Sequence, residues 1–146
     1  MVNFIKRNAL YGAWAVSLVA MLGSLYFSEI AKYPPCVLCW YQRICMYPLV
    51  VILGFAIYKK DRNLLLPAFV LAVVGWLISV YHNLLYYKIL PEAAAPCIAG
   101  VSCTTKFIEW FGFVTIPFLA FLGFSAILTG LIIHWRTNRM ETNQNV

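Results

Sequence analysis

Five cysteines are the residues of this chain whose types and spacing could do chemistry. Cys36 and Cys39 form a CxxC pair, Cys97 and Cys103 form a CxxxxxC pair, and Cys45 is left over. Paired cysteines can exchange electrons as dithiol and disulfide, hold a metal ion as thiolates, or cross-link the fold as structural disulfides. Cys45 lies within an apolar stretch, where a free thiol packs as a small apolar group, so we interpret it as a core residue.

Thiol–disulfide exchange is the chemistry that the two spacings favour. A CxxC closes so small a loop that its disulfide adds little stability through loop entropy, which argues against a purely structural role. A four-cysteine zinc site usually has two tight pairs, and the spacing of Cys97 and Cys103 is looser. We therefore predict redox cysteines and no metal ligands, with the structural and zinc-binding interpretations still open at this point.

The residues around the first pair strengthen the redox interpretation. Residues 33–43 read YPPCVLCWYQR, and proline is favoured where a helix begins. A helix that starts there places Cys36 near its N-terminus, where unpaired amides and the helix dipole stabilise a thiolate. Cys39 and Arg43 are then i,i+4 neighbours, so that the guanidinium favours the Cys39 anion. The alternative is that Arg43 only extends to the membrane surface.

A second polar cluster lies in the third apolar stretch. Ser79, His82, Asn83 and Tyr86 fall at i, i+3, i+4 and i+7, which places them on one helical face. The expected depth of His82 matches that of Arg43, and an apolar pocket with these two polar groups would suit a lipid-soluble quinone. The alternative is a histidine that is simply hydrogen-bonded inside the helix bundle.

The elements that must position these residues are membrane helices. Of the 146 residues, 63% are hydrophobic and 11% are charged, which is too apolar for a soluble domain of this size. Uncharged stretches cover residues 9–28, 44–58, 64–87 and 110–135, and about 20 helical residues span a bilayer. The second stretch reaches spanning length if it begins at 40, so the expected spans are about 9–28, 40–59, 64–87 and 110–135. The fold class is an all-α integral membrane protein with four transmembrane helices in one domain, residues 1–146.

The distribution of Lys and Arg predicts the orientation of these helices. Seven of the eleven lie near the two termini and in the loop at 59–63, and four lie in the other two connections. Because cytoplasmic flanks carry the excess, we expect both termini to be cytoplasmic and two short cysteine-bearing loops to be external. The net charge of +6 is explained by this bias, and we predict no nucleic-acid partner. A cleaved signal peptide is the alternative for the first stretch, but that stretch is too long and has no clear cleavage site.

The motif at 36–43, CVLCWYQR, resembles the quinone-side motif of the DsbB family of membrane disulfide oxidoreductases. The short chain with its CxxxxxC pair looks most like the BdbC-like branch. The resemblance implies a multi-pass protein of the bacterial cell membrane that reoxidises an extracytoplasmic thioredoxin-like thiol oxidase, DsbA- or BdbD-like, and passes the electrons to a quinone, menaquinone or ubiquinone.

The resemblance also implies a role for each candidate residue. The partner would attack the Cys97–Cys103 disulfide at Cys97, electrons would pass to Cys36–Cys39, and the Cys39 thiolate would engage the quinone. Arg43 and His82 would bind the quinone, with Arg43 stabilising the thiolate. The chain departs from proteobacterial members in its short second cysteine loop, which offers less surface for docking a partner.

Two other functions are considered from the sequence. A small proton-coupled transporter needs an ionisable carboxylate within the bundle, and all five acidic residues lie outside the apolar stretches. A disulfide-stapled or metal-binding membrane protein without redox turnover stays the alternative, and stoichiometric zinc on the four paired thiols would identify it.

Overall fold

The computed structural model describes residues 2–91 and 115–144, and all regular secondary structure in these residues is helical. Four long helices follow one another along the chain: α1 Val2–Leu25, α2 Val37–Lys59, α3 Leu65–Tyr86 and α4 Ile116–Gln144. A π-helix, η1, covers Tyr26–Ile30, and a 3-10 helix, η2, covers Arg62–Leu64. The predicted all-α class is confirmed.

Four helical segments of 23 to 25 residues, one on each long helix and two of them extended by η1 or η2, are long and apolar enough to cross a membrane, which confirms the four predicted spanning helices. Their bounds differ in detail from the expected spans. The second segment begins at Val37 and not at residue 40, so the whole CVLCWYQR motif except Cys36 is helical. The fourth is described from Ile116, and residues 110–114 of its expected span lie outside the described part of the chain.

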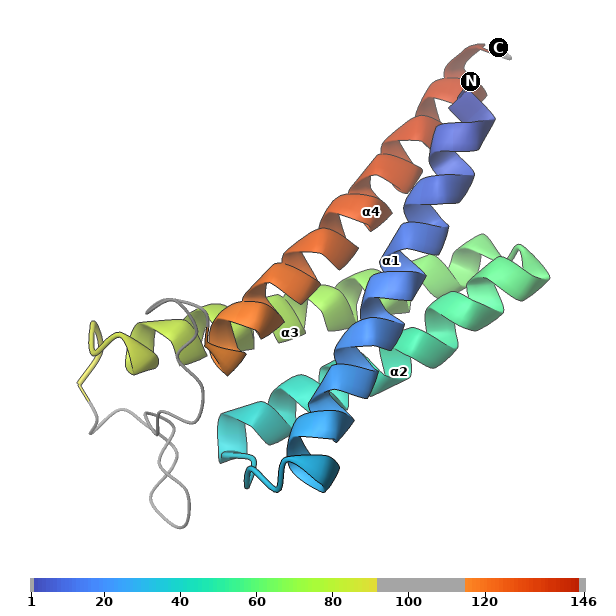
Figure 1. Cartoon of the computed structure of the whole chain (residues 1–146). Coiled ribbons are helices and arrows are strands. Elements are labelled where there is room, and N and C mark those ends of the chain that lie inside the picture. The colour runs from blue at the N-terminus through green and yellow to red at the C-terminus, as the bar shows by residue number, and fades with distance from the viewer. Residues whose placement is uncertain (1, 92–114, 145–146) are drawn as a thin grey trace.

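The helices form a bundle in which each packs against two neighbours. α1 contacts α2 and α4, and α3 also contacts α2 and α4. Figure 1 shows α1 running beside α4, with the N-terminal end of α1 close to the C-terminal end of α4. Because consecutive helices alternate in direction, the α2–α3 connection lies at that same end. Cys36 at the start of α2 therefore lies at the opposite end of the bundle.

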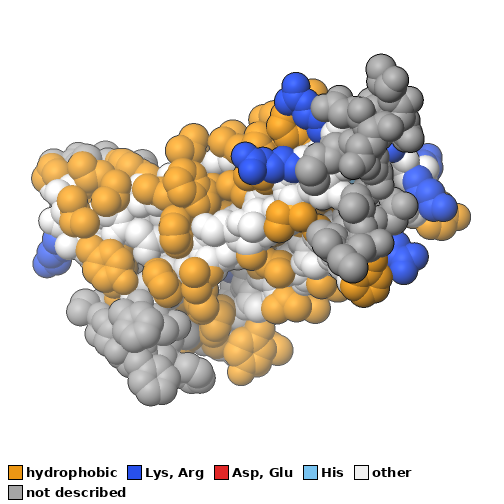
Figure 2. Space-filling model, turned by 90° about the horizontal axis from the view of Figure 1, so that it is seen from above, with side chains coloured by type: hydrophobic (Ala, Val, Ile, Leu, Met, Phe, Trp, Pro, Cys, Tyr) orange, Lys and Arg blue, Asp and Glu red, His pale blue; other side chains and the backbone are white. Residues whose placement is uncertain are grey.

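The outer surface is as apolar as a lipid-facing surface should be. Large apolar side chains point outward from all four helices, among them Val19 at 68% exposure and Leu66 at 71%. Figure 2 shows the apolar side chains over the middle of the molecule, with Lys and Arg gathered toward its ends. In water this surface would be an aggregation hazard, whereas in a bilayer it carries no such cost.

The core lies between the four helices and holds them in fixed register. Leu49, Leu53, Phe124 and Ile127 are fully buried there. A Cβ atom on Gly75 of α3 would overlap the ring of Phe124, so the absence of a side chain lets α3 and α4 approach closely.

Two tryptophan indoles tie neighbouring helices together. Trp14 Nε1 of α1 donates a hydrogen bond to Val50 O of α2 at 3.1 Å. Trp76 Nε1 of α3 donates to Ser125 Oγ of α4 at 3.0 Å. Such bonds satisfy donors that lipid cannot satisfy, and they fix the helices that carry the candidate site.

Candidate functional site

Cys36 and Cys39 lie at the N-terminus of α2, as the sequence predicts. Cys36 is itself the N-cap residue, with extended φ and ψ of −72° and 169°, and its sulfur accepts a hydrogen bond from Cys39 N at 3.4 Å. The two prolines precede the cap, so they do not occupy the first helical turn. A hydrogen bond joins the two sulfur atoms at 2.9 Å, and both thiols are free.

The sulfur–sulfur distance also bears on the zinc interpretation. The ligand atoms of Cys36, Cys39 and His82 lie within 4.8 Å of one another, which is a possible metal-ligand set. Two thiolates on one tetrahedral zinc ion, each about 2.3 Å from the metal, must stand roughly 3.7 Å apart. The sulfurs of the free pair are 2.9 Å apart, so a zinc ion would require them to move apart and a disulfide would require them to move together.

His82 lies beside the cysteine pair and is almost completely buried, at 1% exposure. Its Nε2 atom is 3.8 Å from Cys36 Sγ, and its Nδ1 atom is 3.4 Å from Gln42 Nε2. The sequence predicts that His82 lies at the same depth in the membrane as Arg43. The structure places His82 beside Cys36. Gln42 is a site residue that the sequence analysis missed, although a polar side chain inside an apolar helix is a usable signal.

The surroundings of Cys36, which immediately precedes the spanning helix, favour its thiolate. The hydrogen bond with the Cys39 side chain makes the largest contribution and, with those from the His82 side chain and the Cys39 backbone, lowers the pKa of Cys36 to about 4. Burial of the sulfur opposes this effect but does not cancel it. A thiolate is the form that attacks disulfides and gives up electrons, so Cys36 is prepared for exchange at neutral pH.

Arg43 lies one turn below Cys39 and reaches into the bundle. Its Nη2 atom donates a 3.0 Å hydrogen bond to Ser24 O in the last turn of α1, and its guanidinium lies over the Trp40 ring at 5.6 Å. These contacts hold the charge at the wall of the site and do not direct it to the membrane surface. The partner carbonyl precedes η1, where the change from α- to π-helix alters the backbone pairing.

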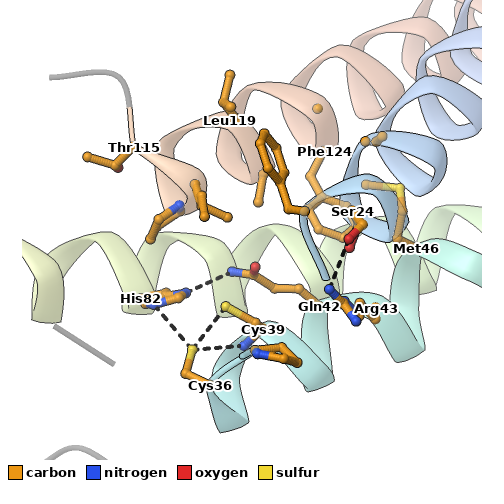
Figure 3. A pocket seen from close by; sticks show the side chains of 18 of the residues that line it. Ser24, Cys36, Cys39, Gln42, Arg43, Met46, His82, Thr115, Leu119 and Phe124 are labelled. Atoms are coloured by element: carbon orange, nitrogen blue, oxygen red, sulfur yellow. Dashed lines mark hydrogen bonds between the residues drawn. The ribbon is translucent and has the colours of Figure 1, made fainter. Parts of the chain in front are cut away.

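A cavity of about 550 Å³ connects these groups, with lining residues from all four long helices. Figure 3 shows the cysteines, Gln42, Arg43 and His82 gathered on one side and Leu119 and Phe124 on another. The remaining lining is mostly apolar or aromatic and includes Ala15, Val16, Val19, Ala20, Phe27, Met46 and Ala120. Such a cavity suits a flat, largely apolar ligand with a few polar atoms.

The other members of the predicted polar face have different surroundings. Ser79 Oγ donates to Trp76 O, and Asn83 Nδ2 donates to Ser79 O and to Pro117 O, so these two side chains stabilise backbone carbonyls of α3 and α4. Tyr86 lines the cavity together with His82.

The remaining cysteines divide between the core and the part of the chain that is not described. Cys45 is a free, buried thiol in the core cluster with Leu49 and Leu53, in keeping with its interpretation as a packing residue. Cys97 and Cys103 lie outside the described residues.

Comparisons with known proteins identify a family and relatives that cover most of the chain. The family model described as "Disulfide bond formation protein DsbB" matches residues 6–132. The chain is 50% identical to "Disulfide bond formation protein C" of Bacillus subtilis (strain 168) over 119 residues, which is 82% of this chain and 86% of the relative. It is 52% identical to "Probable disulfide formation protein C 1" of Bacillus anthracis over 122 residues, 84% of this chain and 88% of the relative. No solved structure matches the chain.

Proposed function

Because the chain belongs to the DsbB family, we propose that it reoxidises an extracytoplasmic thioredoxin-like thiol oxidase and passes the electrons to a membrane quinone. Its membership makes it a disulfide oxidoreductase and a multi-pass bacterial membrane protein. The quinone, the partner and the roles of single residues are our proposal.

One observation carries the proposal. A free cysteine pair whose sulfurs lie 2.9 Å apart forms part of the wall of a mostly apolar cavity that lies between the spanning helices. A dithiol in such a place can exchange electrons with a lipid-dissolved molecule without a water-filled path. A structural disulfide or a stapled bundle would not need a cavity beside the cysteines.

The residues around the cavity fit a quinone. A volume of about 550 Å³ is within the range of roughly 300–1,000 Å³ that small-molecule sites occupy. Arg43 supplies a charged donor and His82 an imidazole on the same side as the cysteines, and the apolar walls match a ring and a prenyl chain. A quinone bound here would supply an acceptor of two electrons and two protons.

The cysteines do the redox work of the chain. Closure of Cys36 and Cys39 to a disulfide forms one S–S bond and releases two electrons and the protons that the thiols still hold. In the reduced pair the hydrogen bond from Cys39 favours a negative charge on Cys36. When a thiolate from outside attacks the disulfide at Cys36, the leaving group is the Cys39 thiolate, one turn above Arg43. Arg43 stabilises that charge, while His82 holds a proton beside Cys36.

The second pair connects this site to the partner. We propose that the reduced partner attacks the Cys97–Cys103 disulfide at Cys97, and that the pair then passes its electrons to Cys36–Cys39. A quinone pool is a suitable sink, because each ~30 mV of potential difference in a two-electron couple is worth about 1.4 kcal/mol. The partner therefore stays oxidised as long as respiration reoxidises the quinone.

Turnover by the purified full chain in detergent tests the proposal. The assay supplies a short-chain ubiquinone or menaquinone analogue with a reduced thioredoxin-like dithiol protein, and it follows quinone absorbance and free thiols together. We expect one quinone reduced for every two thiols lost, no turnover by Cys39→Ser, and normal turnover by the matched control Cys45→Ser. A Cys39→Ser protein that reduces quinone at the normal rate contradicts the mechanism, and stoichiometric zinc without turnover identifies a metal-binding protein.

A further inference from the structure

Gln42 is a buried amide inside a membrane-spanning helix. It is 7% exposed and lies one residue before Arg43, on a part of α2 that faces α3. An amide without hydrogen-bond partners is costly in an apolar environment, so a glutamine here needs a reason. Its side chain lines the cavity beside the cysteines, but the redox step described above makes no use of it.

The contacts of Gln42 lead to the reacting sulfur. Gln42 Nε2 lies 3.4 Å from His82 Nδ1, and the opposite ring nitrogen, Nε2, lies 3.8 Å from Cys36 Sγ. Figure 3 shows the imidazole of His82 joined by one dashed line to the Gln42 amide and by another to the Cys36 sulfur. The row crosses from α2 to α3 and returns to the N-cap of α2.

Which atom donates in these two contacts depends on the imidazole nitrogen that carries the proton, and an amide Nε2 can only donate. An amide N–H that points at Nδ1 needs a lone pair on that nitrogen, so a neutral His82 carries its proton on Nε2. That N–H then faces Cys36 Sγ and donates to the thiolate. The other tautomer would turn a lone pair toward the thiolate, which would repel it.

We propose that Gln42 is a positioning residue that holds His82 in the tautomer whose Nε2–H is directed at Cys36 Sγ. This role of Gln42 adds a residue to the proposed redox site, and its importance for catalysis rests on the proposed function. Gln42 touches neither sulfur in this scheme and acts through His82. The direction of the His82 contribution to the low pKa of Cys36 agrees with an N–H donor at that position.

A test of this kind requires that the other ionisable side chains near the cysteines are the same in every variant. Described residues of α1 and α4 contribute no ionisable side chain to the cavity wall. The titratable and charged groups there come from α2, α3 and the segment that holds Cys36, and besides Cys36 itself they are Cys39, Arg43, Tyr47, His82, Tyr86 and Tyr33. None of them is changed by a substitution at Gln42.

The pH profile of Cys36 alkylation in the reduced full chain measures the effect directly. Trypsin cleaves after Lys32 and Arg43, so both cysteines fall in one peptide and fragment ions separate them. The variants are Gln42→Leu and Gln42→Met, and the methionine keeps the length of the side chain without its N–H. We expect both to raise the midpoint for Cys36 by about one pH unit, which is a tenfold lower thiolate fraction below the midpoint.

Two controls separate positioning from a general loss of structure. Ser17→Ala removes another buried polar group, one that donates to Trp14 O within α1, and should leave the midpoint unchanged. In a His82→Ala background, Gln42→Met should cause no further shift, because its effect passes through the imidazole. An unchanged midpoint in both single variants, or an equal shift with and without His82, overturns the proposal.

The readout needs no quinone and no partner protein. If the shift occurs but the chain does not reduce quinone, the proposed function fails while the role of Gln42 in holding His82 stands. If quinone turnover occurs but the midpoint does not shift, the proposed function stands while the role of Gln42 in holding His82 fails.

Discussion

At the scale of single residues, Cys36 and Cys45 show how surroundings decide what a thiol does. Cys36 receives hydrogen bonds from the Cys39 backbone and from its neighbours in the site, and they lower its pKa to about 4. Cys45 packs in the apolar core cluster with Leu49 and Leu53, away from the N-terminus of its helix. We therefore expect Cys36 to react and Cys45 to stay inert, although both sulfurs are buried.

The pH dependence of alkylation checks this difference. With a pKa of about 4, Cys36 is already a thiolate at neutral pH, so its rate should change little between about pH 6 and about pH 8. An ordinary thiol, whose pKa is about 8.5, should react about tenfold faster for each unit of rising pH in that range.

The variant Cys39→Ala tests the cause, because it removes the largest contribution to the low pKa. We expect the Cys36 midpoint to move up by several pH units, toward that of an ordinary thiol. Mass spectrometry of the 33–43 peptide gives the rates. A steep rate increase in the unchanged protein, or an unshifted midpoint in the variant, contradicts this account.

Some site residues could be predicted from their spacing within one helix, whereas others depend on how two helices pack. The CxxC pair and Arg43 could be placed from sequence, because i,i+3 and i,i+4 neighbours share a helix face wherever the helix lies. The contact of Gln42 with His82 joins residues 40 positions apart and depends on the rotation of α2 against α3. Sequence periodicity predicts which face is polar, but it gives no such pairwise distance.

At the scale of elements, the approach of α3 to α4 determines where His82 can lie. Gly75 lies two helical turns before His82, under the ring of Phe124. Phe124 is fully buried, so its ring can move away from a new side chain only by displacing its neighbours or by turning into the cavity that it also lines. The α3–α4 distance is thus fixed at a position next to the site.

Gly75→Ala should therefore destabilise the protein. A methyl group there overlaps the Phe124 ring, and overpacking of a tight core costs about 1–3 kcal/mol of the free energy of unfolding. Thermal unfolding in detergent measures the loss. Gly12→Ala is the matched control, because nothing lies within 4 Å of its added methyl group, and it should not lower the melting temperature. Equal melting temperatures for both variants would be evidence against the close approach.

Helix identity was predictable from sequence, and helix ends were less so. Uncharged stretches of sufficient length have few alternatives in a bilayer, which is why the four spanning helices were expected. The start of α2 at Val37 depends on a cap: the Cys36 sulfur accepts a backbone N–H, which the composition of the stretch does not reveal. The π-helix after Leu25 was also not expected, because no residue type specifies it.

At the scale of the whole molecule, the charge bias and the bundle topology together predict which end of the bundle faces the cytoplasm. The alternating helices put both chain ends and the α2–α3 connection at one end of the bundle, and the Cys36 segment at the other. The excess of Lys and Arg lies at the first end, so we propose that this end is cytoplasmic. The cysteine pair then lies toward the external face, where disulfides persist.

Labelling in intact cells tests the orientation. Single cysteines are introduced as Pro34→Cys and Asn63→Cys, both at exposed positions, in a chain whose five native cysteines are serine. A membrane-impermeant maleimide should label Pro34→Cys in intact cells and label Asn63→Cys only after the membrane is opened. The reverse pattern would mean that the positive charges face outward.

The most direct test of the central claim is a single turnover without oxygen. Fully reduced protein is mixed with a quinone analogue, and quinone absorbance is read alongside the oxidation state of the cysteines by peptide mass spectrometry. The account predicts that the Cys36–Cys39 disulfide forms in the 33–43 peptide as quinone is reduced, and that Cys39→Ser reduces none. Quinone that stays oxidised, or that is reduced while Cys36 and Cys39 remain thiols, would contradict it.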